Sequence, residues 1–375
     1  MNRACDDCAR RGWLLGYLAG RLEIRRADRG AIREVLALGD EQLIEALGGR
    51  DRARVTLAWE EADPARLRAA WDAVGCVAIC AHDARYPAGL RDLSDPPAVL
   101  FVLGDPLRLD ALLGAARERG GRHQVAVVGA RRASLDGQAT ARALGRGLSV
   151  AGITVVSGMA LGIDSAAHEG ALEGGGRTVA VLACGPEYAY PPRRRSLHRR
   201  LVEEALVVSE LPPGTTPYRW AFPARNRIIA ALAEMTVLVE AAERSGSLIT
   251  AEIAMDLGRE VGAAPGAPTA WHSTGTNALL RDGARVVRHA LDVLDDVIGV
   301  LPVGAPNPRR VLPAPVGLAP ELHELLTAID GGADTVAGNA ASPAQARAVL
   351  GRLTELELLG LVERRPGGRY VRVTL

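Results

Sequence analysis

Two arginines flank an asparagine in the segment "FPARNRIIAALAEMTVLVEA", at Arg225, Asn226 and Arg227. We expect this triplet at the start of a helix that precedes an apolar strand, and a helix N-terminus already carries partial positive charge. Two guanidinium groups placed there repel one another unless an anion binds. Arginine holds carboxylates and phosphates through paired hydrogen bonds. The segment therefore predicts a bound anion, which is either a ligand phosphate or a carboxylate of the chain, such as Glu240 or Glu243.

Four other loops share this anion-binding character, because each follows an apolar segment and is rich in Gly, Ser, Thr or Arg. They comprise residues 129–137, 157–164, 243–250 and 265–277. Glycine allows close backbone approach, while hydroxyls and helix N-terminal N–H groups donate to anions. Glycine is also the ordinary solution for a tight turn between a strand and a helix. The argument for a phosphate-bearing ligand therefore depends on five such loops meeting at one sheet edge.

The elements that must position these loops alternate between apolar strands and helices from residue 124 onward. Six strands, beginning with "VAVVGA" and "ITVVSG", are interleaved with helices over about 170 residues. Near-continuous apolar strands indicate a parallel sheet that is covered on both faces. We predict an α/β fold with a doubly wound, mostly parallel, extended Rossmann-like sheet. Ligands of such sheets bind at the carboxyl ends of the strands.

Composition and spacing divide the chain into four predicted segments. Residues 1–75 read as a small helical domain of the SAM or helix-hairpin-helix kind, and residues 76–300 as the Rossmann-like domain with an N-terminal extension. Residues 301–318 are dense in proline and predict an extended linker. Residues 319–375 have the pattern of a winged helix. Its main helix carries acidic residues, which favours a protein contact or weak DNA binding over tight DNA binding.

The composition excludes some functions. All 45 basic residues are arginine, so a P-loop and Schiff-base chemistry are both excluded, because each needs a lysine. The net charge of +1 gives no global attraction to nucleic acid. The five cysteines are scattered; Cys5 and Cys8 form a C-x2-C without an evident second pair, and we expect no metal site. Free thiols and the lack of a convincing signal peptide or membrane span favour a cytoplasmic protein.

Several motifs together carry a family resemblance. The segments "VAVVGARRASLDG", "SGMALGIDSAAH", "FPARNR" and "SGSLITAEIA" occur in an order and spacing that resembles the DNA-processing protein A (DprA/Smf) family. The resemblance extends from Tyr86 to about Val297. It implies a single-stranded DNA-binding protein that forms a homodimer and helps to load the RecA recombinase in natural transformation. It also implies a protein that is not an enzyme and needs no cofactor.

The resemblance assigns site residues motif by motif. Gly129 and Arg131 match the family's Gly-x-Arg, and the "SGMALGID" and Arg-Asn-Arg motifs match further positions. A basic run also follows Tyr190 and Pro191. The residues that we expect to contact DNA are Gly129, Arg131, Arg132, Ser157, Gly158, Met159, Gly162, Arg193, Arg194, Arg195, Arg225, Asn226, Arg227, Ser245, Gly246, Ser247 and Thr250.

Aromatic and titratable residues add further expectations. Tyr218 and Trp220 are candidate platforms for stacked bases, whereas Phe222 is expected in the core. Asp164 is expected to cap its helix. His168 has no second ligand at a suitable spacing, so we expect no metal there.

Two enzymatic alternatives compete with a binding function. The stretch from Glu240 to Glu252 is similar in layout to the active-site loop of lysine-decarboxylase-like nucleotide phosphoribohydrolases. In that interpretation Glu252 is the acid and Arg244 holds the phosphate of a nucleoside monophosphate. A dinucleotide-dependent oxidoreductase is disfavoured, because the first loop lacks G-x-G-x-x-G and no acid ends the second strand.

Overall fold

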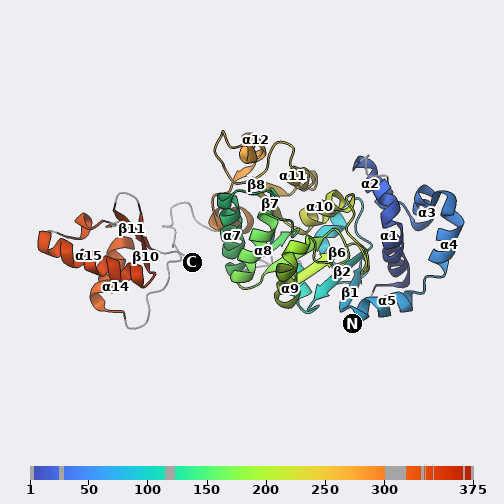
Figure 1. Ribbon diagram of the computed structural model, residues 1–375, viewed down its shortest axis with the longest axis horizontal. Helices are drawn as coiled ribbons and strands as arrows, with labels where there is room; N and C mark the ends of the chain where they lie inside the picture. Colours follow the sequence, from blue (N-terminus) through green and yellow to red (C-terminus); the bar gives the residue numbers. More distant parts are fainter. Residues whose placement is uncertain are drawn as a thin grey trace. The chain divides into compact units, whose positions relative to one another are not determined.

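The computed structural model describes residues 4–24, 29–114, 123–299, 318–330, 333, 335–340, 342–365 and 368–372. Contacts divide the chain into two compact units, Met1–Val300 and Leu301–Leu375 (Figure 1). The predicted linker at 301–318 lies outside the described residues except for Leu318. No described helix combines the length and the apolar character that a membrane span requires.

A nine-stranded sheet forms the centre of the first unit, in the order β1-β2-β6-β5-β4-β3-β7-β8-β9. The strands are β1 (Cys76–Cys80), β2 (Val99–Gly104), β3 (Gln124–Val128), β4 (Thr154–Ser157), β5 (Thr178–Leu182), β6 (Leu206–Ser209), β7 (Met235–Leu238), β8 (Glu260–Ala263) and β9 (Arg285–Val286). Strands β3 to β9 pair in parallel, while β2 is antiparallel to both β1 and β6. The predicted α/β fold with a mostly parallel, doubly wound sheet is confirmed.

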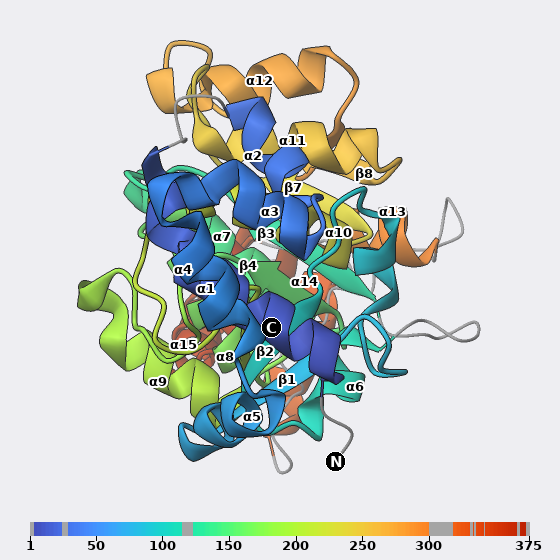
Figure 2. The same ribbon diagram turned by 90° about the vertical axis from the view of Figure 1, so that its right-hand side faces the viewer.

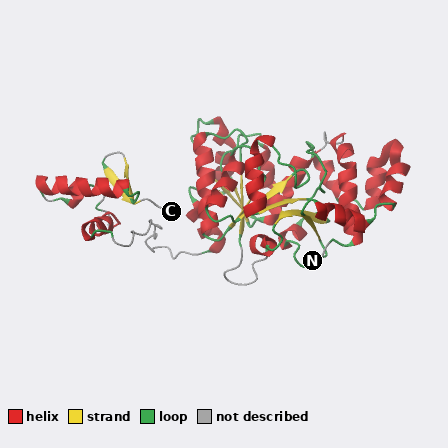
Figure 3. Ribbon diagram, turned by 60° about the horizontal axis from the view of Figure 1, so that its bottom comes forward, coloured by secondary structure: helices red, strands yellow, loops and turns green. Residues whose placement is uncertain are grey.

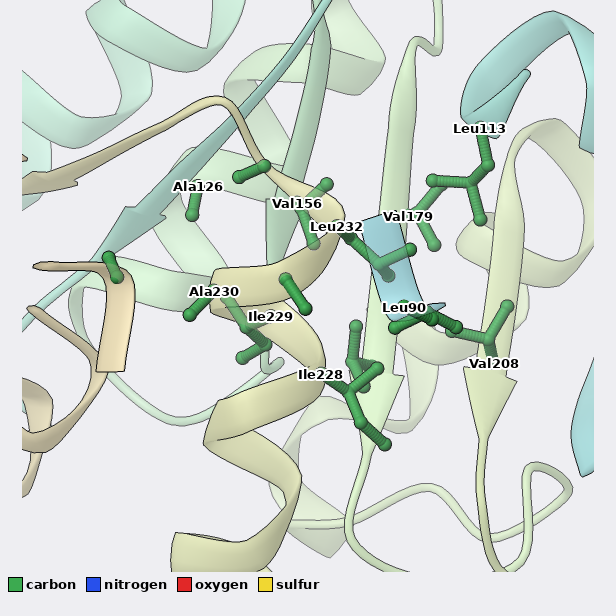
Figure 4. Close-up of a cluster of buried hydrophobic side chains, with 14 of the residues drawn as sticks. Leu90, Leu113, Ala126, Val156, Val179, Val208, Ile228, Ile229, Ala230 and Leu232 are labelled. Carbon is green, nitrogen blue, oxygen red and sulfur yellow. The ribbon is translucent and has the colours of Figure 1, made fainter. Parts of the chain in front are cut away.

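Helices cover both faces of the sheet (Figure 3). Side chains of successive strand residues point to opposite faces, and since they are apolar on both faces, each face has to be covered. One face packs α6 (Arg108–Leu113), α10 (Ala221–Leu232), α11 (Gly246–Asp256) and α12 (Thr274–Arg281). The other packs α7 (Leu135–Val150), α8 (Ile163–Glu173), α9 (Arg195–Glu204) and α13 (Ala290–Ile298). Figure 4 shows the first face, where Ile228 and Leu232 of α10 meet Val179 and Val208 of the strands. Burial on both faces explains why the strands are almost uninterrupted runs of apolar residues.

Five α-helices precede the sheet in the described part of the chain: α1 (Asp6–Ile24), α2 (Arg29–Leu36), α3 (Asp40–Gly48), α4 (Arg52–Glu60) and α5 (Pro64–Ala73). The predicted boundary at residue 75 falls between α5 and β1. The helices nevertheless belong to the first unit, since α1 and α5 share a buried cluster with β1 and β2. A second cluster joins α1 to α4 with the start of α10. Figures 1 and 2 show these helices beside the β1 end of the sheet.

The second unit has its own small core. It contains α14 (Pro320–Asp330), α15 (Pro343–Leu358) and an antiparallel hairpin of β10 (Val362–Arg365) and β11 (Arg369–Arg372). Leu326, Leu353, Leu356 and Tyr370 pack together in that core. Two helices followed by a hairpin are compatible with the expected winged helix, which stays a prediction.

Candidate nucleic-acid interface

The five predicted ligand loops follow β3, β4, β6, β7 and β8, and the basic run after Tyr190 follows β5. The strand order reverses between β3 and β7, which is where a doubly wound sheet offers a crevice. In this protein Glu240 fills that position: its carboxylate accepts hydrogen bonds from the Ser134 backbone N–H (2.9 Å) and from the Ser134 hydroxyl. An acid therefore occupies the N-terminus of α7. The basic groups lie one strand further, around β4 and β5.

The Arg-Asn-Arg triplet does not begin its helix. Helix α10 starts at Ala221, so Arg225 lies in the second turn, beyond the N–H groups that are free at a helix start. The expectation of an N-terminal position was wrong, because "AFP" forms the first turn. Proline is well tolerated near a helix start, where its missing N–H costs no hydrogen bond. The reason for the two arginines must therefore come from their individual partners.

Arg227 is bound within the protein. Its side chain is fully buried, with 0% exposed, and it pairs with Asp95 and Glu210 at 2.8 and 2.7 Å. Two further hydrogen bonds reach the backbone oxygens of Ala224 and Asp95, and a second bond reaches Glu210, so each of the five N–H groups has an acceptor. Burial lowers the pKa of Arg227, but the two carboxylates outweigh it and raise the pKa above the usual range. The prediction that Arg227 holds a ligand phosphate was therefore wrong, and its partners are neither Glu240 nor Glu243.

Arg225 has the opposite character. It is only 6% exposed and donates to the Val181 carbonyl oxygen at 2.8 Å, while its Nε is buried without an acceptor among the described residues. Burial lowers the pKa of Arg225 to about 10; Asp164 opposes this change and Arg131 adds to it. The group stays protonated at neutral pH. A buried cation with an unused donor is a costly arrangement that an incoming anion would relieve.

The loop after β4 is built around this guanidinium. A Cβ added to Gly158 would lie 1.5 Å from Arg225 Nη1, so only glycine leaves room for the arginine. Asp164 accepts from the Gly158 N–H at 3.2 Å and from the Ala160 N–H at 3.4 Å. The prediction that Asp164 caps its helix was wrong, because Gly162 is the N-cap of α8 and Asp164 holds the preceding loop instead. Gly162 has a φ of +81° and lies against the Ala130 carbonyl oxygen, where a Cβ would be 2.2 Å away. The turns after β3 and β4 are thus locked together.

Three predicted contact residues have buried side chains. Ser157 is fully buried and donates its hydroxyl to the Val127 carbonyl oxygen at 2.7 Å. Met159 is also fully buried, and its φ of 58° is unusual for a residue other than glycine. Thr250 is 1% exposed. These side chains face the interior and support the loops. DNA contact at these positions, such as at the predicted Ser157–Gly158 turn, would therefore have to come from backbone groups, and it stays a prediction.

An exposed cation and two aromatic rings lie next to Arg225. Arg131 is exposed and its guanidinium carbon lies 5.2 Å from the centre of the Phe222 ring. The Phe222 ring lies 5.4 Å from that of Tyr190, which is 38% exposed. Phe222 is half-buried and packs against the core cluster of the N-terminal helices, as expected, while part of it stays exposed. The sequence did not reveal this stack, because its members lie in two loops and at the start of α10, which only the fold brings together. We call Arg131, Gly158, Tyr190, Phe222 and Arg225 the edge site.

The loop before α11 lies on the other side of α10. Asn226 donates its side-chain N–H to the Gly246 carbonyl oxygen at 3.3 Å. Ser245 caps α11 by accepting from the Ser247 N–H, and the two hydroxyls lie 2.7 Å apart. Gly246 is exposed. These predicted residues therefore adjoin the helix that carries Arg225.

The basic run after Tyr190 is partly neutralised. Arg194 pairs with Glu169 at 2.9 Å, and Arg200 pairs with Glu204 four residues away. Arg193 and Arg195 are exposed at the start of α9, and within the described part of the chain neither has an ion pair. Arg132 is exposed beside Arg131. Of the predicted cluster, Arg193 and Arg195 remain available to a ligand.

The structure separates the other candidate residues. Trp220 is 2% exposed and donates to the Ala19 carbonyl oxygen, so its prediction as a stacking platform was wrong. Tyr218 is half-buried against the N-terminal helices. Burial lowers the pKa of His168 to about 3, which makes it a neutral core residue beside Thr178. Glu252 and Arg244 are both exposed, and among the described residues they form no pair.

A parallel sheet with reversed strand order and a basic loop cluster at its carboxyl edge defines a Rossmann-like α/β protein. A family model described as DNA recombination-mediator protein A matches residues 77–298. The chain belongs to this family.

Relatives and solved structures agree with this assignment. Protein Smf of Synechocystis is 35% identical over 319 residues, which cover 77% of this chain and 78% of that protein. The crystal structure of DNA processing protein A from Streptococcus pneumoniae matches with a TM-score of 0.59 and 36% identity, over 69% of this chain and 87% of that one. A Helicobacter pylori structure of DNA processing protein A, described for its single-stranded DNA binding mode, matches with a TM-score of 0.51 and 28% identity, over 59% and 97% of the two chains.

Proposed function

We propose that this protein binds single-stranded DNA at the edge site. The observation that carries the proposal is the buried Arg225, whose Nε has no acceptor among the described residues and lies beside the exposed Arg131. A phosphate placed between these guanidinium groups would accept from both and would reduce their mutual repulsion. The single-stranded DNA binding named for the Helicobacter pylori relative supports the same ligand.

The neighbouring rings supply a reason for preferring single strands. Phe222 lies next to Arg131, and Tyr190 packs against Phe222. Unpaired bases stack on such rings with about 1–3 kcal/mol each. In a duplex the bases already stack on one another and their faces are covered. Arg132, Arg193, Arg195 and the Ser245–Ser247 turn would add backbone contacts around this centre.

The wider role follows the family resemblance. We propose that the protein acts in the cytoplasm as a homodimer and passes single-stranded DNA to RecA without catalysing a reaction itself. Arg244 and Glu252 are both exposed and form no ion pair among the described residues, which argues against the phosphoribohydrolase alternative. Release of adenine from AMP by the purified protein would contradict the non-enzymatic assignment.

A competition experiment tests the strand preference. A labelled oligo-dT is bound to the full chain and followed by fluorescence anisotropy while unlabelled single-stranded or duplex DNA of equal length is added. We expect single strands to displace the label at concentrations at least tenfold lower than duplex. Equal competition by the duplex would contradict the proposed function.

A further inference from the structure

Three cysteines and a histidine meet where the first helix approaches the outermost strand. Cys5 directly precedes α1, Cys8 lies in its first turn, Cys80 is the last residue of β1 and His82 follows two residues later. Their four ligand atoms all lie within 4.8 Å of one another. All of these cysteines are free thiols in the structure. No second pair of ligands for the C-x2-C motif of Cys5 and Cys8 was evident in the sequence. The structure places the C-x-H motif of Cys80 and His82, from another segment, beside it.

The distances match a single tetrahedral ion. The Nδ1 atom of His82 lies 3.5 Å from Cys5 Sγ, 3.5 Å from Cys8 Sγ and 4.0 Å from Cys80 Sγ. Zinc bonds of about 2.3 Å to sulfur and about 2.05 Å to nitrogen place such atoms about 3.6 Å apart at tetrahedral angles. An iron–sulfur cluster needs ligands spread around several metal atoms and does not fit this spacing. Three thiolates and one imidazole are a typical structural zinc set.

The backbone holds the ligands in place independently of any ion. The Ala4 N–H donates to the Ala78 carbonyl oxygen at 3.0 Å, which fixes the start of the chain to β1. Arg68 of α5 donates to the Ala4 carbonyl oxygen and to Asp6, at 3.0 and 2.8 Å. Cys8 and Cys80 are 7% and 2% exposed and belong to one apolar cluster with Trp71. His82 is exposed and Cys5 half-buried, so an ion can enter from the surface.

We propose that Cys5, Cys8, Cys80 and His82 bind one structural zinc ion that joins the N-terminal helices to the sheet. All four coordination positions are filled by protein, which is the pattern of structural rather than catalytic zinc. The ion closes a loop between residues that are 77 positions apart in the sequence. Strand β1 is four positions from β4 in the sheet, or about 19 Å at the usual strand spacing. The site is therefore separate from the edge site, and its test does not depend on DNA binding.

Metal analysis of the intact chain tests the proposal. The protein is purified without chelators or metal-affinity resin, and zinc is measured by plasma mass spectrometry alongside protein concentration. Cys80→Ser removes one of the four ligands. Cys76→Ser is the matched control, because Cys76 is a buried cysteine on the same strand that is not one of the four ligands. We expect about one zinc per chain in the wild type and in Cys76→Ser, and at least a tenfold lower content in Cys80→Ser.

A second readout covers the case in which Cys80→Ser does not fold. Wild-type protein stripped of metal is titrated with Co²⁺, and we expect the visible absorption of a tetrahedral ion together with thiolate-to-cobalt charge transfer. Wild-type protein without zinc and without this cobalt spectrum would overturn the proposal. Stoichiometric iron, a disulfide among these cysteines by intact mass, or full zinc retention in folded Cys80→Ser would overturn it as well.

Discussion

Arg225 and Arg227 lie two residues apart on one helix, yet their guanidinium groups have different surroundings. Two residues correspond to a rotation of about 200° around an α-helix, so the side chains leave on nearly opposite sides. Arg227 points to the acids Asp95 and Glu210, and Arg225 points to Gly158 at the sheet edge. One arginine of the motif therefore holds the fold together, and the other is left for a ligand.

Loss of Arg227 is expected to destabilise the protein. In Arg227→Ala the carboxylates of Asp95 and Glu210 would stay buried without their partner, and breaking a buried pair costs about 3–5 kcal/mol. Arg200→Ala, which breaks an exposed pair with Glu204, should cost less than about 1 kcal/mol. Urea unfolding of both variants measures the difference. Similar midpoints for the two would show that the buried pair contributes little.

A methyl group at Gly158 is expected to abolish the edge site. The new Cβ of Gly158→Ala would overlap Arg225 Nη1, so the guanidinium must leave its position next to Arg131. We expect at least a tenfold loss of oligo-dT affinity. Gly39→Ala is the matched control, because its added Cβ would meet only Gln42 Oε1 at an ordinary 3.6 Å and Gly39 lies outside the predicted DNA contacts. Retained affinity in Gly158→Ala, with circular dichroism like that of the wild type, would contradict a role of Arg225 in DNA binding.

His168 is expected to make the protein sensitive to acid. Burial, and then the charge of Arg225, lower the pKa of His168 to about 3, whereas an unfolded histidine titrates near about 6.5. Between these values the unfolded chain binds a proton that the folded chain does not bind. The free energy of unfolding should therefore fall as pH decreases from 6.5, by up to about 1.4 kcal/mol per pH unit. Urea midpoints measured from pH 7.5 to 4.5 should fall more steeply for wild type than for His168→Gln; parallel curves would refute this origin.

At the scale of elements, glycine sets the contact between α7 and α8. A Cβ at Gly170 of α8 would lie 1.9 Å from the Arg142 carbonyl oxygen of α7, so the two helices touch through their backbones. Gly170→Ala should force them apart and cost about 1–3 kcal/mol. Gly351→Ala, on an open side of α15, should instead stabilise its helix by about 0.5–1 kcal/mol. Native-state hydrogen exchange measures the protection of the α8 amides in Gly170→Ala, which should decrease, and of the α15 amides in Gly351→Ala, which should increase. Protection of α8 in Gly170→Ala equal to that in wild type would contradict the predicted destabilisation.

Elements could be predicted from the sequence better than partners could. Period and apolar content are local properties, so the order of strands and helices and the parallel sheet were predictable. The acids that bind Arg227 could not be predicted in this way. Asp95 lies 132 residues from Arg227 in the sequence and comes close to it only because the antiparallel strands β1 and β2 extend the parallel sheet. For the same reason, the contacts of His82 with Cys5 and of Phe222 with Arg131 could not be predicted, because each joins segments that are far apart in the sequence. A spacing motif indicates a site only when its residues come from one segment.

For the whole molecule, the small net charge of +1 means that DNA affinity has to come from local arrangement. Acids neutralise many arginines, as at Arg194, Arg200 and Arg227. The exposed cations Arg131 and Arg132 lie at the carboxyl ends of the parallel strands. Arg281, which is also exposed, lies at the end of α12 just before β9 begins, and so at the amino ends of the strands. This contrast between the two ends of the strands permits a matched comparison of single arginines.

The salt dependence of DNA binding shows whether Arg131 of the edge site contacts a DNA phosphate. Oligo-dT affinity is measured by anisotropy over a range of salt concentrations for wild type, Arg131→Ala and Arg281→Ala. Each lost phosphate contact should flatten the slope of log affinity against log salt by about 0.7 for single strands. We predict this loss, with weaker binding, for Arg131→Ala and an unchanged slope for Arg281→Ala. Equal affinity and slope for Arg131→Ala and wild type would contradict the assignment of the edge site to DNA.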